Sequence, residues 1–98
     1  MSEFRDVDPA ELRVLPSRGQ AADPAKLARQ ISLFGKSTMG MPPPWVYEGL
    51  DGVLILFNGV TRATRIAKLD LGQLIRVEVI GKLARAFGKE SKIGDLLP

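Results

Sequence analysis

The chain has neither cysteine nor histidine among its 98 residues. Without cysteine there can be no disulfide, thiolate metal site or cysteine nucleophile. Without histidine the commonest general base and most zinc or iron sites are also excluded. No apolar run approaches the roughly 20 residues of a membrane-spanning helix, and the acidic N-terminal residues do not resemble a secretory signal. We therefore expect a cytoplasmic protein without a membrane partner.

Acidic residues are scarce in the second part of the chain. This uneven distribution of charge is more informative than the net charge of +3. Residues 1–58 carry six basic and seven acidic side chains, whereas residues 59–98 carry eight basic and four acidic ones. A basic region favours a polyanionic partner. An ordinary solvated surface explains the same balance equally well, because acidic residues are interspersed and aromatic residues are only 6% of the chain.

The stretch from Val53 to Leu69 organises the rest of the sequence. Five apolar residues, Val53–Phe57, predict a short strand covered on both faces and therefore in the interior of a sheet. Asn58 and Gly59 end the strand, and a helical pattern begins at about Thr61. A strand, a glycine turn and a helix start present free backbone N–H groups to an anion.

Arg62 has a special position in this predicted helix. At about 100° per residue, it falls on the apolar face beside Leu69, whereas Arg65 lies at the edge of that face. An arginine in this position lines a cleft and contacts a ligand, or else its stem packs on the sheet while its head reaches water. We favour the cleft, with Asn58, Gly59, Thr61, Arg62 and Arg65 as phosphate-binding residues.

The remaining elements follow from local signals. Asp23-Pro24 is a cap-and-proline start and Gly35 a glycine stop, so they predict a helix over Pro24–Phe34 whose stripe includes Leu27 and Ile31. We expect both long helices to pack on the sheet. The other expected elements are a single turn after Asp8, an extended piece at 13–15, a hairpin pairing 45–48 with 53–57, a half-buried strand at 75–80 ended by Gly81, and a short helix at 82–87.

Two loops carry further candidate ligand contacts. Arg18 lies in the loop 16–20, where it either contacts a ligand or is simply solvated. The run Gly35-Lys36-Ser37-Thr38 lacks the earlier glycine and the preceding strand of a phosphate loop, so we reject that interpretation. The loop either folds over a ligand, with Lys36, Ser37 and Thr38 as contacts, or is a plain connector.

The order of these pieces resembles the ParB/sulfiredoxin-like family over roughly residues 5–81. The resemblance is carried by Met41-Pro42-Pro43-Pro44-Trp45-Val46 before a strand, by Asn58-Gly59-Val60-Thr61-Arg62, and by Leu71-Gly72 with Val77-Glu78-Val79. It implies one α+β domain over residues 1–98, with a mixed sheet and two to three packed helices. We expect residues 82–98 to form a C-terminal helix and tail.

The resemblance also has functional implications. In that family the loop and helix after the apolar strand hold nucleotide phosphates, and Gly59, Thr61 and Arg62 match those positions. Val60 stands where sulfiredoxins have their catalytic cysteine, so sulfiredoxin chemistry is excluded. Some relatives are ParB-like nucleases, and similar small domains occur as toxin modules of polymorphic toxin systems. A nucleoside triphosphate with Mg²⁺ as cofactor, and an oligomeric or immunity-type protein partner, would fit these contexts.

Two classes of function remain open at this point. The first is a module that binds a nucleotide or a DNA or RNA backbone. The second is an enzyme that cleaves phosphodiesters, which needs a base or a metal. Without histidine or cysteine, the ligands of a metal would be carboxylates, and those nearest in sequence are Glu48, Asp51 and Asp70. Because these three do not converge in the sequence, we rank binding above catalysis and expect no metal site.

Overall fold

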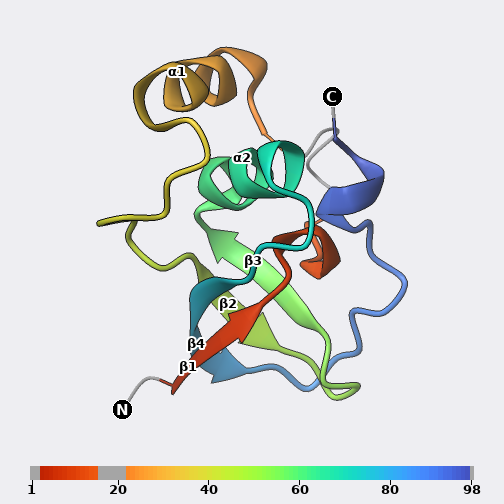
Figure 1. The fold of residues 1–98 in the computed structure, drawn as a ribbon. Helices are drawn as coiled ribbons and strands as arrows, with labels where there is room; N and C mark the ends of the chain where they lie inside the picture. The colour runs from red at the N-terminus through yellow and green to blue at the C-terminus, as the bar shows by residue number, and fades with distance from the viewer. Residues whose placement is uncertain (1–2, 16–21, 98) are drawn as a thin grey trace.

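A four-stranded mixed sheet forms the base of the molecule in the computed structural model, which describes residues 3–15 and 22–97. Its strands run in the order β1-β4-β2-β3. The pairs β1–β4 and β2–β3 are antiparallel, and β2 runs parallel to β4 (Figure 1). The bounds are β1 Glu3–Val7, β2 Trp45–Glu48, β3 Leu54–Asn58 and β4 Ile75–Lys82, with helices α1 Pro24–Phe34 and α2 Val60–Leu69 and single 3₁₀ turns η1 Pro9–Glu11 and η2 Ile93–Asp95.

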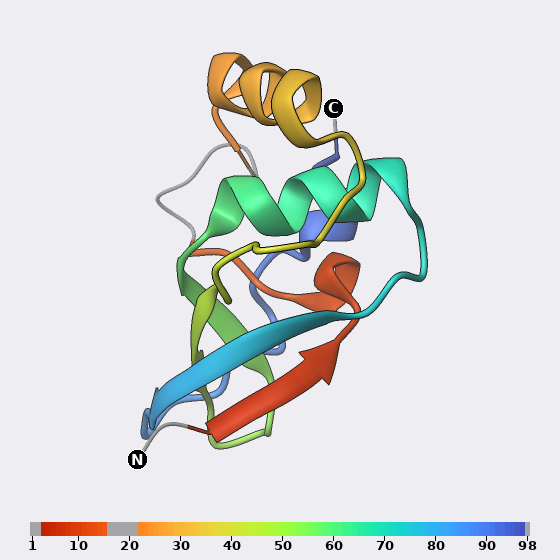
Figure 2. The ribbon, with the colours of Figure 1, turned by 60° about the vertical axis from the view of Figure 1, so that its left-hand side comes forward.

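The helices form two further layers above the sheet. Figure 2 shows α2 lying over the sheet and α1 lying over α2, with both helices beginning at the same end of the molecule. The expectation that α1 packs on the sheet is therefore wrong, since it packs on α2 instead. Leu27 is the buried contact of α1, whereas Phe34 at its end is 54% exposed. Because α2 lies between two layers, Ala63, Ile66 and four other residues of its ten are buried.

The strand β4 and the hairpin supply the core beneath α2. The predicted alternation of β4 is confirmed, because Ile75, Val77 and Val79 are all buried. Val46 of β2 and Leu56 of β3 join them against the underside of α2. The predicted hairpin is also confirmed, as β2 and β3 are antiparallel neighbours. The core is thus formed by the side chains on the face of the sheet toward α2, packed against the side chains of α2 itself.

The strand β3 lies at the edge of the sheet, so the prediction that Val53–Phe57 is an interior strand is wrong. Its outer side is protected by a single bridge: Arg13 N–H donates to Leu54 C=O at 3.0 Å, and Leu56 N–H donates to Arg13 C=O at 2.9 Å. Both faces of the strand are nevertheless apolar because residues 83–87 cover Ile55 on the side away from α2.

The expected helix at 82–87 is wrong as well. β4 continues through Gly81 to Lys82, and residues 83–90 follow as an irregular segment. The register of this region shifts near Ile80, so Tyr47 pairs with Gly81. Phe87, at the end of the expected helix, is almost fully buried, but it lies in an irregular segment.

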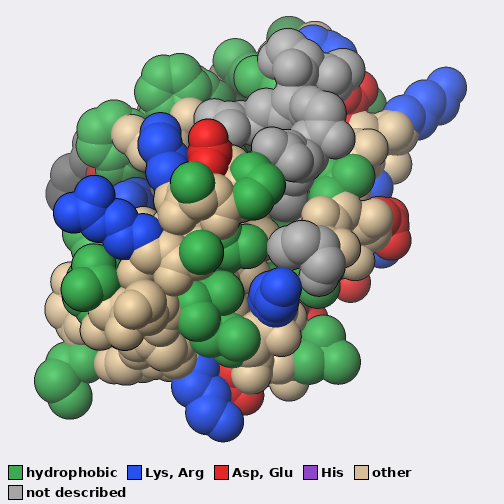
Figure 3. Space-filling model, turned by 90° about the horizontal axis from the view of Figure 1, so that it is seen from above, with side chains coloured by type: hydrophobic (Ala, Val, Ile, Leu, Met, Phe, Trp, Pro, Cys, Tyr) green, Lys and Arg blue, Asp and Glu red, His purple; other side chains and the backbone are tan. Residues whose placement is uncertain are grey.

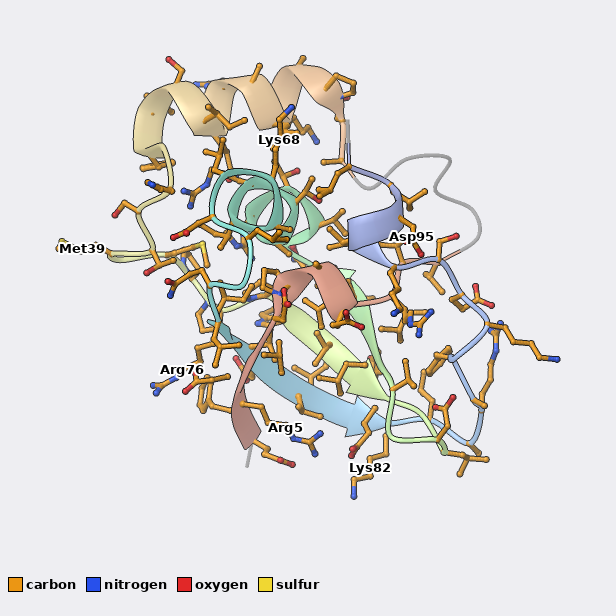
Figure 4. The ribbon with its side chains drawn as sticks, turned by 45° about the vertical axis from the view of Figure 1, so that its right-hand side comes forward. Arg5, Met39, Lys68, Arg76, Lys82 and Asp95 are labelled. Atoms are coloured by element: carbon orange, nitrogen blue, oxygen red, sulfur yellow. The ribbon has the colours of Figure 1, made fainter. Side chains whose placement is uncertain are left out.

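The far end of the sheet is closed by ion pairs. Arg5 donates to Glu48 at 2.9 and 3.2 Å, and Lys82 lies 3.8 Å from the same carboxylate, at the lower end of the molecule in Figure 4. The hydrogen bond from Arg5 holds the pKa of Glu48 below its usual range. Within the described residues, no helix has the length and apolar character needed to cross a membrane.

Candidate functional site

The start of α2 has a tightly constrained backbone. Gly59 is the residue before the first helical turn, and its φ of 94° lies in the left-handed region that favours glycine. There is also no room for a side chain, since a Cβ on Gly59 would lie 2.7 Å from Pro44 Cβ and 2.8 Å from the Nη2 atom of Arg62. The guanidinium of Arg62 therefore folds back over the glycine turn at the helix start.

A hollow of about 220 Å³ opens at this point, and we call it the helix-start cavity. The N–H groups of Val60, Thr61 and Arg62 belong to the first turn of α2, which has no acceptors for them within the helix. The Gly59 position provides no side-chain cap. The cavity is lined by Asp23, Lys26, Gln30, Phe57, Asn58, Gly59, Val60, Thr61 and Arg62.

The guanidinium of Arg62 has no partner among the described residues of this cavity. It makes no hydrogen bond or ion pair with any residue that the structure describes, and its buried Nε atom has no acceptor there. Burial lowers the pKa of Arg62 from its usual value. A partly buried cation at the positive end of a helix has an unfavourable environment unless an anion is bound.

Arg65, one turn further along α2, has a different environment. Its side chain is almost fully buried, and its Nη1 atom donates to the carbonyl oxygens of Gly35 at 2.7 Å and Ser37 at 2.9 Å. Its guanidinium also lies 5.5 Å from the ring centroid of Phe34. Burial lowers its pKa as well. Arg65 thus fixes the loop after α1, and the predicted geometry is reversed: Arg65 is more buried than Arg62, because α1 and that loop cover this side of α2.

The loop after α1 borders a second hollow of about 190 Å³, the loop cavity. Arg62 and Gln30 line both hollows and so form the wall between them. Ser37 lines the loop cavity, as does Met39, which points outward and is 91% exposed (Figure 4). Of the other predicted contacts, Lys36 and Thr38 are exposed and line neither hollow. Arg18 lies outside the described residues.

The structure therefore brings four of the predicted residues together at the helix-start cavity: Asn58, Gly59, Thr61 and Arg62. It adds Lys26 and Gln30 from α1, which the sequence did not suggest. The buried Oε1 atom of Gln30 has no donor among the described residues. The signal for Lys26 was its place in the first turn of a helix, but only the packing of α1 on α2 shows that the two helix starts meet.

The three carboxylates considered as metal ligands do not line the helix-start cavity. Glu48 is paired with Arg5, and Asp70 is at the opposite end of α2. Burial tends to raise the pKa of Asp51, but N–H donors from Gly88 at 2.8 Å, Phe87 at 3.1 Å and Val53 at 3.2 Å outweigh it, so the pKa is lowered. Asp51 thus fastens the irregular segment to the hairpin turn. No group of three acidic side chains suited to a metal ion occurs among the described residues.

Comparison with known proteins leaves the site to be judged on its geometry. No model of a protein family matches the chain, and no curated protein matches it closely enough to be a relative.

On the visible face above α1 and α2, lysine and arginine side chains are spread among hydrophobic ones instead of forming one patch (Figure 3). The local geometry at the start of α2 is therefore more informative than the overall charge.

Proposed function

We propose that this chain is a binding domain for a phosphate-bearing ligand, either a nucleotide or a nucleic-acid backbone, and that the helix-start cavity receives the phosphate. The free N–H groups of the first turn of α2 would donate to the phosphate oxygens. Arg62 would add a charge-assisted two-point contact. Thr61, Asn58 and Lys26 line the same hollow and can supply further donors.

The observation that carries this proposal is the contrast between Arg62 and the other partly or fully buried arginines. Arg5 donates to Glu48, Arg13 donates to the Glu90 carbonyl at 2.7 Å, and Arg65 donates to two loop carbonyls. Arg62 alone among these four has no oxygen partner within the described residues. A ligand oxyanion would supply the missing acceptor.

Asp23 also lines this cavity, but its carboxylate is already used. It accepts the N–H groups of Ala25 at 2.8 Å and Lys26 at 3.2 Å, and so caps α1. Its negative charge is thereby placed against the positive end of α1, which reduces its repulsion toward an anion bound at α2.

We also propose that the chain is a ParB/sulfiredoxin-like domain, on the sequence motifs around Pro42–Pro44, Asn58–Arg62 and Val77–Val79. In support, a proline-led strand, a hairpin, the Asn58–Arg62 loop-helix and the strand β4 follow one another in the expected order. Nucleotide hydrolysis and phosphodiester cleavage are not part of the proposal, because Glu48 and Asp51, the nearest carboxylates considered, are each bound to groups of the protein itself.

The test is calorimetric titration of the protein with inorganic phosphate, nucleoside mono- and triphosphates with and without Mg²⁺, and short nucleic acids. Arg62→Ala should weaken phosphate-ligand binding by roughly 2–5 kcal/mol, the range for truncating a buried charged partner. Arg62→Lys should recover only part of the loss, because an ammonium cannot make the planar contact.

Arg29→Ala is the matched control, because it removes an exposed arginine of α1 and the same unit of charge. If Arg62→Ala binds every tested ligand as the parent protein does but melts earlier, Arg62 is a packing residue and the proposal fails. For nucleic acid, affinity should also fall steeply as salt is increased, without marked sequence preference.

A further inference from the structure

Three aromatic side chains lie together on the side of the sheet that faces away from α2, and we call them the aromatic face: Trp45 and Tyr47 of β2 with Phe57 of β3. The rings of Trp45 and Phe57 are nearly parallel, at 5°, with centroids 6.4 Å apart. The ring of Tyr47 meets Phe57 edge-on at 5.7 Å. Both helices lie on the other side of the sheet, with α2 between the sheet and α1 (Figures 1 and 2).

The side chains of Trp45 and Phe57 are exposed, and that of Tyr47 is half-buried. Phe57 is 56% and Trp45 is 43% exposed, and the three residues are half of the six aromatic residues in the chain. An aromatic side chain that stays in contact with water does not contribute the free energy of folding that its burial would provide. Flat rings at neighbouring positions on an open sheet are instead suited to stacking against the faces of planar ligands.

An apolar groove of about 380 Å³ extends this surface. Tyr47 and Phe57 form one wall, and Leu83, Arg85 and Phe87 of the irregular segment form the other. The side chain of Arg85 is 59% exposed, and its Nη2 atom lies 3.6 Å from the Oε1 atom of Glu90, whose side chain is only 15% exposed. Because Leu50 N–H in the hairpin turn donates to the Arg85 carbonyl oxygen at 2.8 Å, this basic residue lies at the end of the groove away from α2.

Phe57 connects this surface to the proposed phosphate site, because it lines both the groove and the helix-start cavity. A phosphate held by Arg62 would thus lie beside an exposed aromatic ring. On the same side of the sheet, β1 and β4 carry Asp6, Glu78 and Arg76, with Arg76 3.7 Å from Asp6, so their net charge there is −1. An anionic chain would accordingly follow β2 and β3, between Arg62 at one end and Arg85 at the other.

We infer that the aromatic face binds the bases of a single-stranded nucleic acid while the helix-start cavity holds a phosphate of its backbone. The inference rests on the proposed function and narrows its ligand. A duplex keeps its base faces inside the stack, so it cannot use exposed rings, whereas an unpaired strand presents every base face. Because every base has such a face, recognition should depend weakly on sequence.

Trp45 provides a direct readout, since it is the single tryptophan of the chain and lies on the aromatic face. Titration with hexathymidylate should quench its fluorescence. The strand should bind at least tenfold more tightly than thymidine 5′-monophosphate or a duplex of equal length. Phe57→Leu should weaken hexathymidylate binding about tenfold, the loss of one base–ring stack.

Phe4→Leu is the control, because Phe4 is similarly exposed, at 52%, on the same side of the sheet but on β1. It should leave binding within about twofold of the parent, and circular dichroism should show all variants folded. If Arg62→Ala abolishes strand binding but Phe57→Leu does not change it, the inference is overturned while the proposed function stands.

Other results would also overturn the inference. Equal affinity for the mononucleotide and the strand would indicate a site for free nucleotide. Tighter binding of the duplex would indicate recognition of the backbone alone. Self-association that Phe57→Leu abolishes, measured by sedimentation, would indicate that a second copy covers the aromatic face. Absence of strand binding at low salt would exclude the inference, and the phosphate titrations would then decide the proposed function separately.

Discussion

The two long helices begin side by side, but the positive end of each helix dipole is treated differently by the residues around it. At the start of α1 the carboxylate of Asp23 accepts two backbone N–H groups, so this helix carries its own anion. At the start of α2 a glycine provides no side chain, and the first turn contains Arg62 instead of an acid. A cation there is unfavourable by roughly 0.3–1 kcal/mol at an exposed site. The start of α1 thus has an acceptor for its N–H groups within the chain, whereas the start of α2 has none among the described residues, as expected if an anion from outside the chain binds there.

The largest expected effect comes from filling the turn that makes α2 different. Gly59→Ala should lower the free energy of unfolding by about 2–5 kcal/mol, combining the left-handed backbone with overpacking against Pro44. Gly72→Ala is the control, since its φ of 89° is similar but a Cβ there meets nothing within 4 Å. Urea unfolding of both variants measures the difference, and equal losses would mean that the turn is not crowded.

The second effect concerns the missing anion. Phosphate at a hundred times its dissociation constant should stabilise the parent protein by about 2.7 kcal/mol. In Arg62→Ala the same phosphate concentration should give little stabilisation, while the melting temperature without phosphate should stay the same or rise. Thermal unfolding with and without phosphate, at constant ionic strength, tests both statements. An early-melting variant that still responds fully to phosphate would contradict them.

A smaller effect is expected at the other arginine of α2. Arg65→Ala leaves the carbonyl oxygens of Gly35 and Ser37 without their buried donor, so it should lower stability by about 2 kcal/mol. Its effect on phosphate binding should be smaller than that of Arg62→Ala. Denaturant unfolding and calorimetric titration on the same sample separate the two roles. The assignment of Arg65 to the loop is wrong if stability is unchanged and binding is lost.

The smallest effect comes from making α1 resemble α2. Asp23→Ala removes the cap of α1 and should cost about 1 kcal/mol of stability. Because it also removes a negative charge from the helix-start cavity, phosphate binding should strengthen slightly. Unfolding and titration experiments again provide the measurements, and weaker phosphate binding in this variant would show that Asp23 helps the ligand instead of opposing it.

The sequence predicted most reliably where a few neighbouring residues decide the structure. The helix α1 agrees residue for residue because Asp23, Pro24 and Gly35 act through contacts within a turn or two. The hairpin and the inward alternation of β4 agree for the same reason. Elements that depend on distant partners were less predictable. The strand β1 has apolar residues only at Phe4 and Val7, so it lacks the alternation typical of a strand, yet it pairs with β4.

At the candidate site the sequence identified the right turn but misjudged the two arginines. A helical wheel has one buried face, whereas α2 is covered by the sheet on one side and by α1 and its following loop on another. Arg65 was placed at an edge and is buried, and Arg62 was placed in the centre and is partly exposed. The same lack of tertiary information hid Lys26, which reaches the cavity from α1.

The backbone bridge at Arg13 also affects the tendency of the protein to aggregate. This short segment pairs with β3 on one side, and through Val14 N–H and the carbonyl oxygen of Leu12 it pairs with Ser91 and Ile93 on the other. It therefore covers the edge of the most hydrophobic strand in the chain. If the segment detaches, Leu54–Phe57 becomes an open, uncharged strand edge of the kind that recruits other chains into aggregates. At high protein concentration, aggregation by intermolecular strand pairing at β3 should accordingly begin before the rest of the sheet unfolds.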